Sequence, residues 1–140
     1  MKRTIVCWLA SFIVTFLLNG AFHGGLAAGF FDSELAHFGE HVHKMSEFNP
    51  APAAVLEAVL SFVLVYLITS RSSQPTGSFG ARTGAALGLA TSATWSLANA
   101  ATFKMWSLSL TLGDVAWHTA LGALMGWLVV WLWNKLAPKG

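Results

Sequence analysis

The stretch "LGDVAWHTALGALMGWLVVWLW", residues 112–133, decides the fold class of this chain. It contains one acid, Asp114, and one histidine, His118, among residues that are otherwise apolar or small. A helix needs roughly 20 predominantly apolar residues to cross a lipid bilayer. Isolated strands are not tolerated in lipid because their unpaired backbone groups cannot be hydrated there. The stretch therefore predicts a transmembrane helix.

Three further stretches have the same character, at about residues 4–22, 51–69 and 84–103. The whole chain is 55% hydrophobic and 10% charged, whereas a soluble domain has about 25% charged residues. We therefore expect an all-α fold, a four-helix transmembrane bundle that occupies residues 1–140 as a single domain. A basic start followed by an apolar core is also typical of a signal peptide. Since the apolar run continues with little break to Phe31, we expect the first span to be retained.

Lysine and arginine predict the orientation, because cytoplasmic loops are enriched in both. Most of these residues gather on one side of the predicted membrane, namely Lys2, Arg3, Arg71, Arg82, Lys135 and Lys139. Only Lys44 and Lys104 fall on the other side. We expect both termini to be cytoplasmic in a bacterial inner membrane. The net charge of +2 indicates no nucleic-acid partner, so the lipid bilayer is the expected one.

Glycines recur every four residues in several predicted spans: Gly80, Gly84 and Gly88; Gly122 and Gly126; Gly20 and Gly24; Gly25 and Gly29. Small residues at this spacing let helix backbones approach closely in lipid. The spacing does not say whether the partner helix belongs to the same chain. A homo-oligomer, or another membrane protein bound through these faces, is therefore also expected.

The ionisable and amide residues of the four spans fall in the outer half of the predicted bundle. Such side chains are costly in lipid and usually face a bundle interior or a cavity. We predict an outward-facing polar pocket formed by His23, Glu57, Asn99, Lys104, Asp114 and His118.

Individual members of this pocket have alternative interpretations. Asp114 suits the positive end of a helix dipole, but it also lies four residues before His118, where the two can pair. Glu57 is flanked on both sides by Ala-Val-Leu, so it is either protonated or paired with a group such as Lys104. Asn99, like Asn19, is expected to form interhelical hydrogen bonds.

The segment "HFGEHVHKMSE", residues 37–47, contains three of the five histidines. With the residues before it, the segment predicts a short amphipathic helix on the outer membrane surface. On such a helix Glu34, His37 and His41 share a face, and two imidazoles with one carboxylate can bind zinc or a similar divalent ion. His43 lies off that face. The alternative is a solvated loop with no ligand.

The stretch "ATSATWSLANAATFKMWSLSLTLGDVAWHTALGALMG", residues 90–126, resembles an uncharacterised bacterial family of predicted membrane proteins numbered 2177, and its neighbour numbered 1761. The resemblance implies a small four-span protein but no activity. Where the family tends to have a Tyr-Asp pair, this chain has Trp95 and Ser96. The likeness rests on Asn99, Ala101, Thr102, Lys104, Trp106, Leu110, Thr111, Asp114 and Trp117.

Together these patterns predict a binding or transport-type membrane protein whose outward-facing pocket takes a ligand such as a divalent metal. One alternative is a structural subunit that packs on another membrane protein through its glycine faces. A membrane enzyme with Glu57 or Asp114 as acid-base group is less favoured, because no nucleophile or cofactor motif accompanies them.

Overall fold

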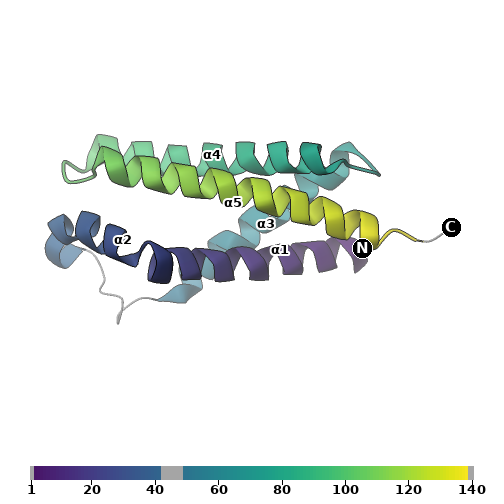
Figure 1. The fold of residues 1–140 in the computed structure, drawn as a ribbon, viewed down its shortest axis with the longest axis horizontal. Helices are drawn as coiled ribbons and strands as arrows, with labels where there is room; N and C mark the ends of the chain where they lie inside the picture. The colour runs from purple at the N-terminus through teal and green to yellow at the C-terminus, as the bar shows by residue number, and fades with distance from the viewer. Residues whose placement is uncertain (1, 42–48, 139–140) are drawn as a thin grey trace.

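A computed structural model describes residues 2–41 and 49–138 of the chain (Figure 1). These residues form helices and no strand, which confirms the predicted all-α fold. In chain order the elements are α1 (Lys2–Ala21), the π-helix η1 (Phe22–Leu26), α2 (Ala28–Leu35), the 3-10 helix η2 (Ala36–His41), α3 (Pro50–Arg71), α4 (Gly77–Thr102) and α5 (Leu108–Lys135).

Three helical segments of the described chain are long and apolar enough to cross a membrane: Lys2–Leu26, Pro50–Arg71 and Leu108–Lys135. They correspond to the first, second and fourth predicted spans. The third span falls in α4, whose 26 residues extend for about 39 Å. Its many glycine, serine and threonine residues make it less apolar than the other three, so its crossing of the membrane stays a prediction.

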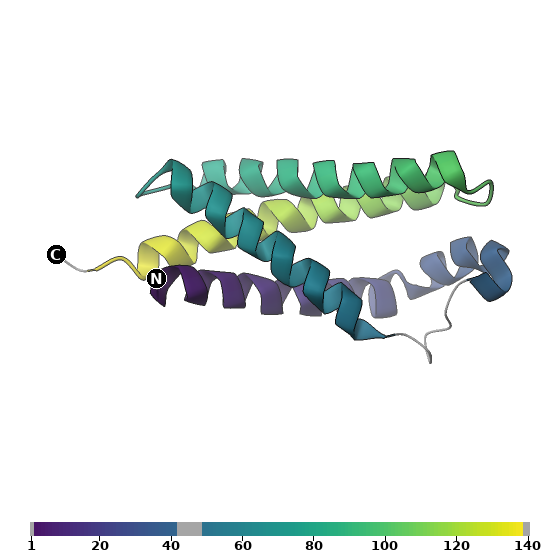
Figure 2. The ribbon, with the colours of Figure 1, turned by 180° about the vertical axis from the view of Figure 1, so that it is seen from behind.

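The long helices form a bundle in which α4 and α5 run antiparallel, side by side along their lengths (Figures 1 and 2). Helix α1 lies along α5, and α3 crosses the bundle obliquely (Figure 2). The start of α1, the turn between α3 and α4, and the end of α5 meet at one end of the molecule. The turn between α4 and α5 and the short helix α2 lie at the other.

Glycine allows the close approach of α4 and α5. A Cβ atom at Gly84 would overlap the carbonyl oxygen of Gly122, and one at Gly126 would overlap that of Gly80. The glycine faces of α4 and α5 therefore pack against each other within the chain, which answers the question that the sequence left open for them. Around Gly20 on α1, by contrast, a Cβ atom would meet nothing within 4 Å.

The apolar core lies in the half of the bundle near the start of α1. Cys7 is fully buried there. It packs with Leu64, Val65, Ile68, Leu121, Met125, Val129 and Val130. The core therefore leaves the other half of the bundle for polar side chains.

The segment from Ala28 to His41 differs from its prediction. Helix α2 ends at Leu35, and the following 3-10 helix is interrupted at Gly39, which has φ 56° and ψ −127°. Residues with a Cβ atom rarely adopt positive φ, and an α-helix cannot pass through it. The prediction of one continuous helical face for Glu34, His37 and His41 is therefore wrong.

Candidate functional site

Polar side chains from all four long helices meet in the half of the bundle opposite the apolar core. Helix α1 and the π-helix that follows contribute an amide and an imidazole, α3 a carboxylate, α4 a hydroxyl, and α5 three further groups. We call this set the polar cluster. Its members are Asn19, His23, Glu57, Ser96, Asp114, Trp117 and His118.

Asn19 joins three helices of the polar cluster. Its Nδ2 donates to Oε1 of Glu57 on α3, and its Oδ1 accepts from Nε1 of Trp117 on α5 at 2.6 Å. A side-chain amide can do both because it carries a donor and an acceptor. Glu57 is only 8% exposed, so this bond supplies the partner that a buried carboxyl requires. Lys104, the partner considered from sequence, is instead exposed in the turn between α4 and α5.

Asp114 and His118 form the second connected group. Nδ1 of His118 lies 3.2 Å from Oδ1 of Asp114 and 2.9 Å from its backbone carbonyl oxygen. Ser96 on α4 donates to the other carboxylate oxygen at 2.8 Å. Ser107, not Asp114, caps the start of α5 by accepting from the backbone nitrogen of Leu110 at 2.9 Å. Asp114 thus acts as a partner of His118, as the four-residue spacing predicts.

The hydrogen bonds of His118 determine which ring nitrogen can accept a hydrogen bond from a ligand. A backbone carbonyl oxygen only accepts, so Nδ1 must carry a proton to bond to it. When the imidazole is neutral, Nε2 therefore has a lone pair. In His23 the ring is held in the same way, with Nδ1 3.1 Å from the carbonyl oxygen of Asn19.

The π-helix places His23 beside His118. Their ring centroids are 5.9 Å apart, and Phe31 covers His23 with a centroid distance of 4.5 Å. The neighbouring Phe22 stacks on Trp117 at 3.8 Å with an angle of 3° between the rings. Single turns of π-helix are often found at functional sites. Here the turn brings the end of the first span onto α5.

A groove of about 750 Å3 opens beside the polar cluster, between α3, α4 and α5. Glu57, Asp114 and His118 contribute its ionisable groups. The remaining lining is mostly apolar and comes from Leu56, Leu60, Ala90, Thr91, Ser92, Thr94, Trp95 and Ala98. A cavity of about 50 Å3 deeper between the helices shares Glu57 and His118 with the groove. Two ionisable side chains therefore line both spaces.

Three residues predicted for the pocket do not line the groove. His23 belongs to the polar cluster through its contact with His118 but is not part of the lining. Asn99 does not line the groove, and its buried Nδ2 has no hydrogen-bond partner among the described residues. Lys104 is exposed. Conversely, Ser96 and Trp117 were not among the residues predicted for the pocket. No local pattern signals either contact, because each joins residues on different helices.

The predicted metal ligands Glu34 and His37 have different surroundings. Glu34 accepts from Ser107 and, at 2.8 Å, from Ser109, which ties α2 to the start of α5 and lowers the pKa of the carboxyl. His37 is exposed. The side chain of His41 and the whole of residues 42–48, including His43, lie outside the described structure.

No group of three or more His, Cys, Asp or Glu side chains in residues 2–41 and 49–138 is placed to hold a metal ion. Since the side chain of His41 is not among those described, the zinc site stays a prediction of the sequence.

Comparison with known proteins gives one match. No curated protein and no solved structure matches the chain. The model of the family described as predicted membrane protein (DUF2177) matches residues 4–131. The match covers all the long helices apart from their ends, and it agrees with the resemblance carried by residues 90–126. The chain therefore belongs to the DUF2177 family of predicted membrane proteins.

Proposed function

We propose that this membrane protein binds a small amphipathic molecule in the groove between α3, α4 and α5, as a binding or transport-type protein. The observation that carries the proposal is the groove itself. About 750 Å3 of space with mostly apolar walls ends on Glu57, Asp114 and His118. Ligand pockets are commonly lined by apolar groups with a few polar ones that orient the ligand.

The free atoms of the polar cluster indicate the chemistry of the ligand. Both oxygens of Asp114 are hydrogen-bonded, whereas no bond to described residues is found for Oε2 of Glu57 or Nε2 of His118. These two atoms are acceptors when the carboxyl is ionised and the imidazole is neutral. The groove is lined by two carboxyl groups and one imidazole, so a hydrogen-bond donor or a positive charge, such as an alkylamine, suits it best.

The proposal includes four spans and an outward-facing groove. Helix α4 runs beside α5 along its length (Figure 1), so a bilayer crossed by α5 also surrounds α4. The groove lies away from the end that carries Lys2, Arg71 and Lys135. Because basic residues favour the cytoplasmic side, the groove then opens toward the outer side of a bacterial inner membrane, with both termini inside.

Single cysteines test this orientation. In a Cys7→Ala background, Ser46→Cys should react with a membrane-impermeant maleimide added to intact cells, because the residue falls between the first two predicted spans, on the side expected to be outside. Ser73→Cys, in the exposed turn between α3 and α4, should react only after the membrane is permeabilised. The reverse pattern would invert the orientation and place the groove on the cytoplasmic side.

A brominated alkylamine tests the groove. Bromine quenches nearby tryptophan, and Trp95 lines the groove. We expect 12-bromododecylamine to quench the purified protein saturably, and 12-bromododecanol to bind at least about tenfold more weakly, which corresponds to about 1.4 kcal/mol. Glu57→Gln keeps an acceptor for Asn19 but removes the charge. It should weaken amine binding by about tenfold and leave alcohol binding unchanged.

Two variants serve as controls for this measurement. Glu34→Gln removes a carboxylate that lies outside the groove and should leave amine binding as in the wild type. Trp95→Phe should lose the quenching signal while calorimetry still detects binding. Equal affinity for amine and alcohol, or equal losses in Glu57→Gln and Glu34→Gln, would rule out Glu57 as the ligand-binding charge.

A further inference from the structure

The end of the bundle opposite the polar cluster is positively charged, and no acidic side chain of residues 2–41 and 49–138 lies there. We call it the basic end, and its members are Lys2, Arg3, Arg71, Arg82 and Lys135. The acids of the described chain are Asp32, Glu34, Glu40, Glu57 and Asp114. They lie in α2, η2, the first half of α3 and the start of α5, all toward the other end. Positive charge at the basic end is therefore not neutralised within the described part of the protein.

Two of these cations lie over tryptophan rings. The guanidinium of Arg3 is 3.8 Å from the ring centroid of Trp133, and Nζ of Lys135 is 4.6 Å from that of Trp131. Nε of Arg3 is buried and has no hydrogen-bond partner among the described residues. Cation–π contact positions a charged group but leaves its N–H donors unused. Aromatic rings thus position these cations, and no anionic partner is found for them among the residues that the structure describes.

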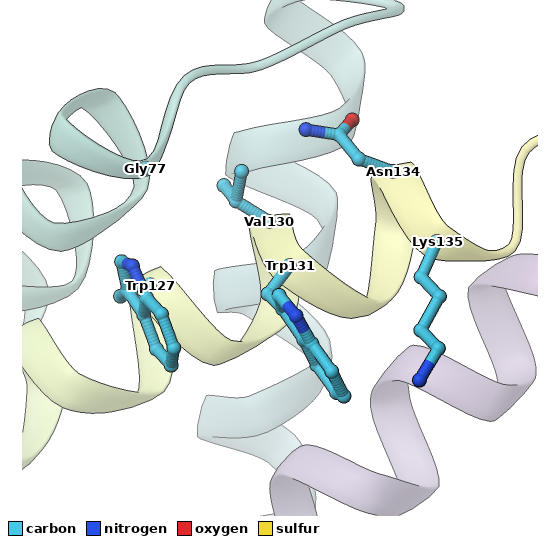
Figure 3. Close-up of a pocket in the computed structure, with 6 residues that line it drawn as sticks. All are labelled: Gly77, Trp127, Val130, Trp131, Asn134 and Lys135. Carbon is cyan, nitrogen blue, oxygen red and sulfur yellow. The ribbon is translucent and has the colours of Figure 1, made fainter.

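A pocket of about 380 Å3 lies beside Lys135 (Figure 3). Trp127 and Trp131 project from α5 on the same side, one turn apart, and Lys135 follows after another turn (Figure 3). Both indoles are almost half exposed, at 49% and 45%. Val130, Asn134 and Gly77, the first residue of α4, complete the lining. The ammonium group of Lys135 therefore lies next to an apolar surface formed by the two indoles.

The adjoining turn is held in place. Asn134 donates to the carbonyl oxygen of Pro75 at 3.0 Å, and Nε1 of Trp133 donates to that of Ser73 at 3.2 Å. These bonds fasten the turn between α3 and α4 against the end of α5. The pocket wall is therefore formed by two elements that are joined to each other.

We infer that this pocket binds an anionic phospholipid, with the phosphodiester at Lys135 and an acyl chain along Trp127 and Trp131. Positive charge near a membrane surface attracts anionic lipids, and tryptophan favours the level of the headgroups. Basic residues alone would be enough to orient the protein in the membrane. The pocket also supplies an apolar surface on which an acyl chain can lie. That surface favours a lipid over free phosphate as the occupant.

Native mass spectrometry of the full chain in detergent tests the inference. The probes are phosphatidylglycerol and phosphatidylcholine with the same acyl chains, and glycerol phosphate as the soluble headgroup. We expect phosphatidylglycerol to remain bound at least about fivefold more than phosphatidylcholine, the preference that one basic residue near a membrane surface provides. Glycerol phosphate should not be retained. Lys135→Gln should abolish most of the preference.

Lys104→Gln is the matched control, since Lys104 is also exposed but lies in the turn at the opposite end. It should keep the wild-type preference. Equal retention of the two lipids by the wild type would overturn the inference, as would a Lys135→Gln variant with unchanged preference. Retention of glycerol phosphate at the level of the lipid would show that the site recognises phosphate and not a lipid.

Discussion

Gly84→Leu is expected to separate α4 from α5 and to destabilise the protein by about 3 kcal/mol or more. Any Cβ atom at this position overlaps the carbonyl oxygen of Gly122, and Gly126 lies in contact as well. A backbone oxygen cannot move aside as a flexible side chain can, so the helices themselves must shift. Since native proteins are stable by only about 5–15 kcal/mol, this loss is a large part of the total. Equilibrium unfolding in mixed micelles of mild detergent and SDS measures it.

Gly20→Ala is the matched control for Gly84→Leu. Its Cβ atom would meet nothing within 4 Å, and alanine favours helix over glycine by about 1 kcal/mol. We therefore expect equal or slightly greater stability than the wild type. A Gly84→Leu variant as stable as Gly20→Ala would contradict the close contact between α4 and α5.

Asn19→Leu is expected to cost about 3 kcal/mol, because one side chain satisfies two partners, the buried Glu57 and the half-buried Trp117. Its loss leaves Oε1 of Glu57 and Nε1 of Trp117 without their hydrogen bonds. Each unsatisfied buried group costs about 1–3 kcal/mol, and a charged group costs more. The same unfolding measurement applies, and loss of alkylamine quenching should accompany it because Glu57 is no longer held in place.

Asn99→Leu is the control for Asn19→Leu, because it replaces another asparagine of the bundle by the same residue. The amide nitrogen of Asn99 is buried without a partner in the described structure, so its replacement by leucine removes no hydrogen bond from it. We expect a change of less than about 1 kcal/mol. If both asparagine variants lose stability equally, Asn19 does not have the joining role that its two bonds indicate.

The helices could be predicted from single stretches of sequence because each depends on local length and apolar content. The fourth predicted span, about 112–133, lies within α5, and the second, about 51–69, lies within α3. Where local composition was mixed, prediction was less secure. Glycine and hydroxyl residues left α4 outside the set of clear candidate spans. The apolar pattern also predicted one helix through Gly39, where the positive φ interrupts the 3-10 helix.

The candidate site was only partly predictable. The pair Asp114 and His118 follows from a spacing of four residues on one helix. The bond from Trp117 to Asn19 joins residues 98 apart in the chain, and that from Asn19 to Glu57 joins residues 38 apart. Such contacts depend on how the helices rotate and cross, which no local pattern specifies.

By itself, the sequence determined that the protein is helical, that it belongs in a membrane, and that its polar residues gather at one end while most of its basic residues gather at the other. These properties depend on which residues follow one another, since helix length and hydropathy are local quantities. Only the tertiary structure decided that the glycines of α4 meet those of α5, that Asn19 and not Lys104 holds Glu57, and that a groove opens beside His118. Each of these depends on the rotation of one helix against another, and that rotation results from the packing of all the helices together.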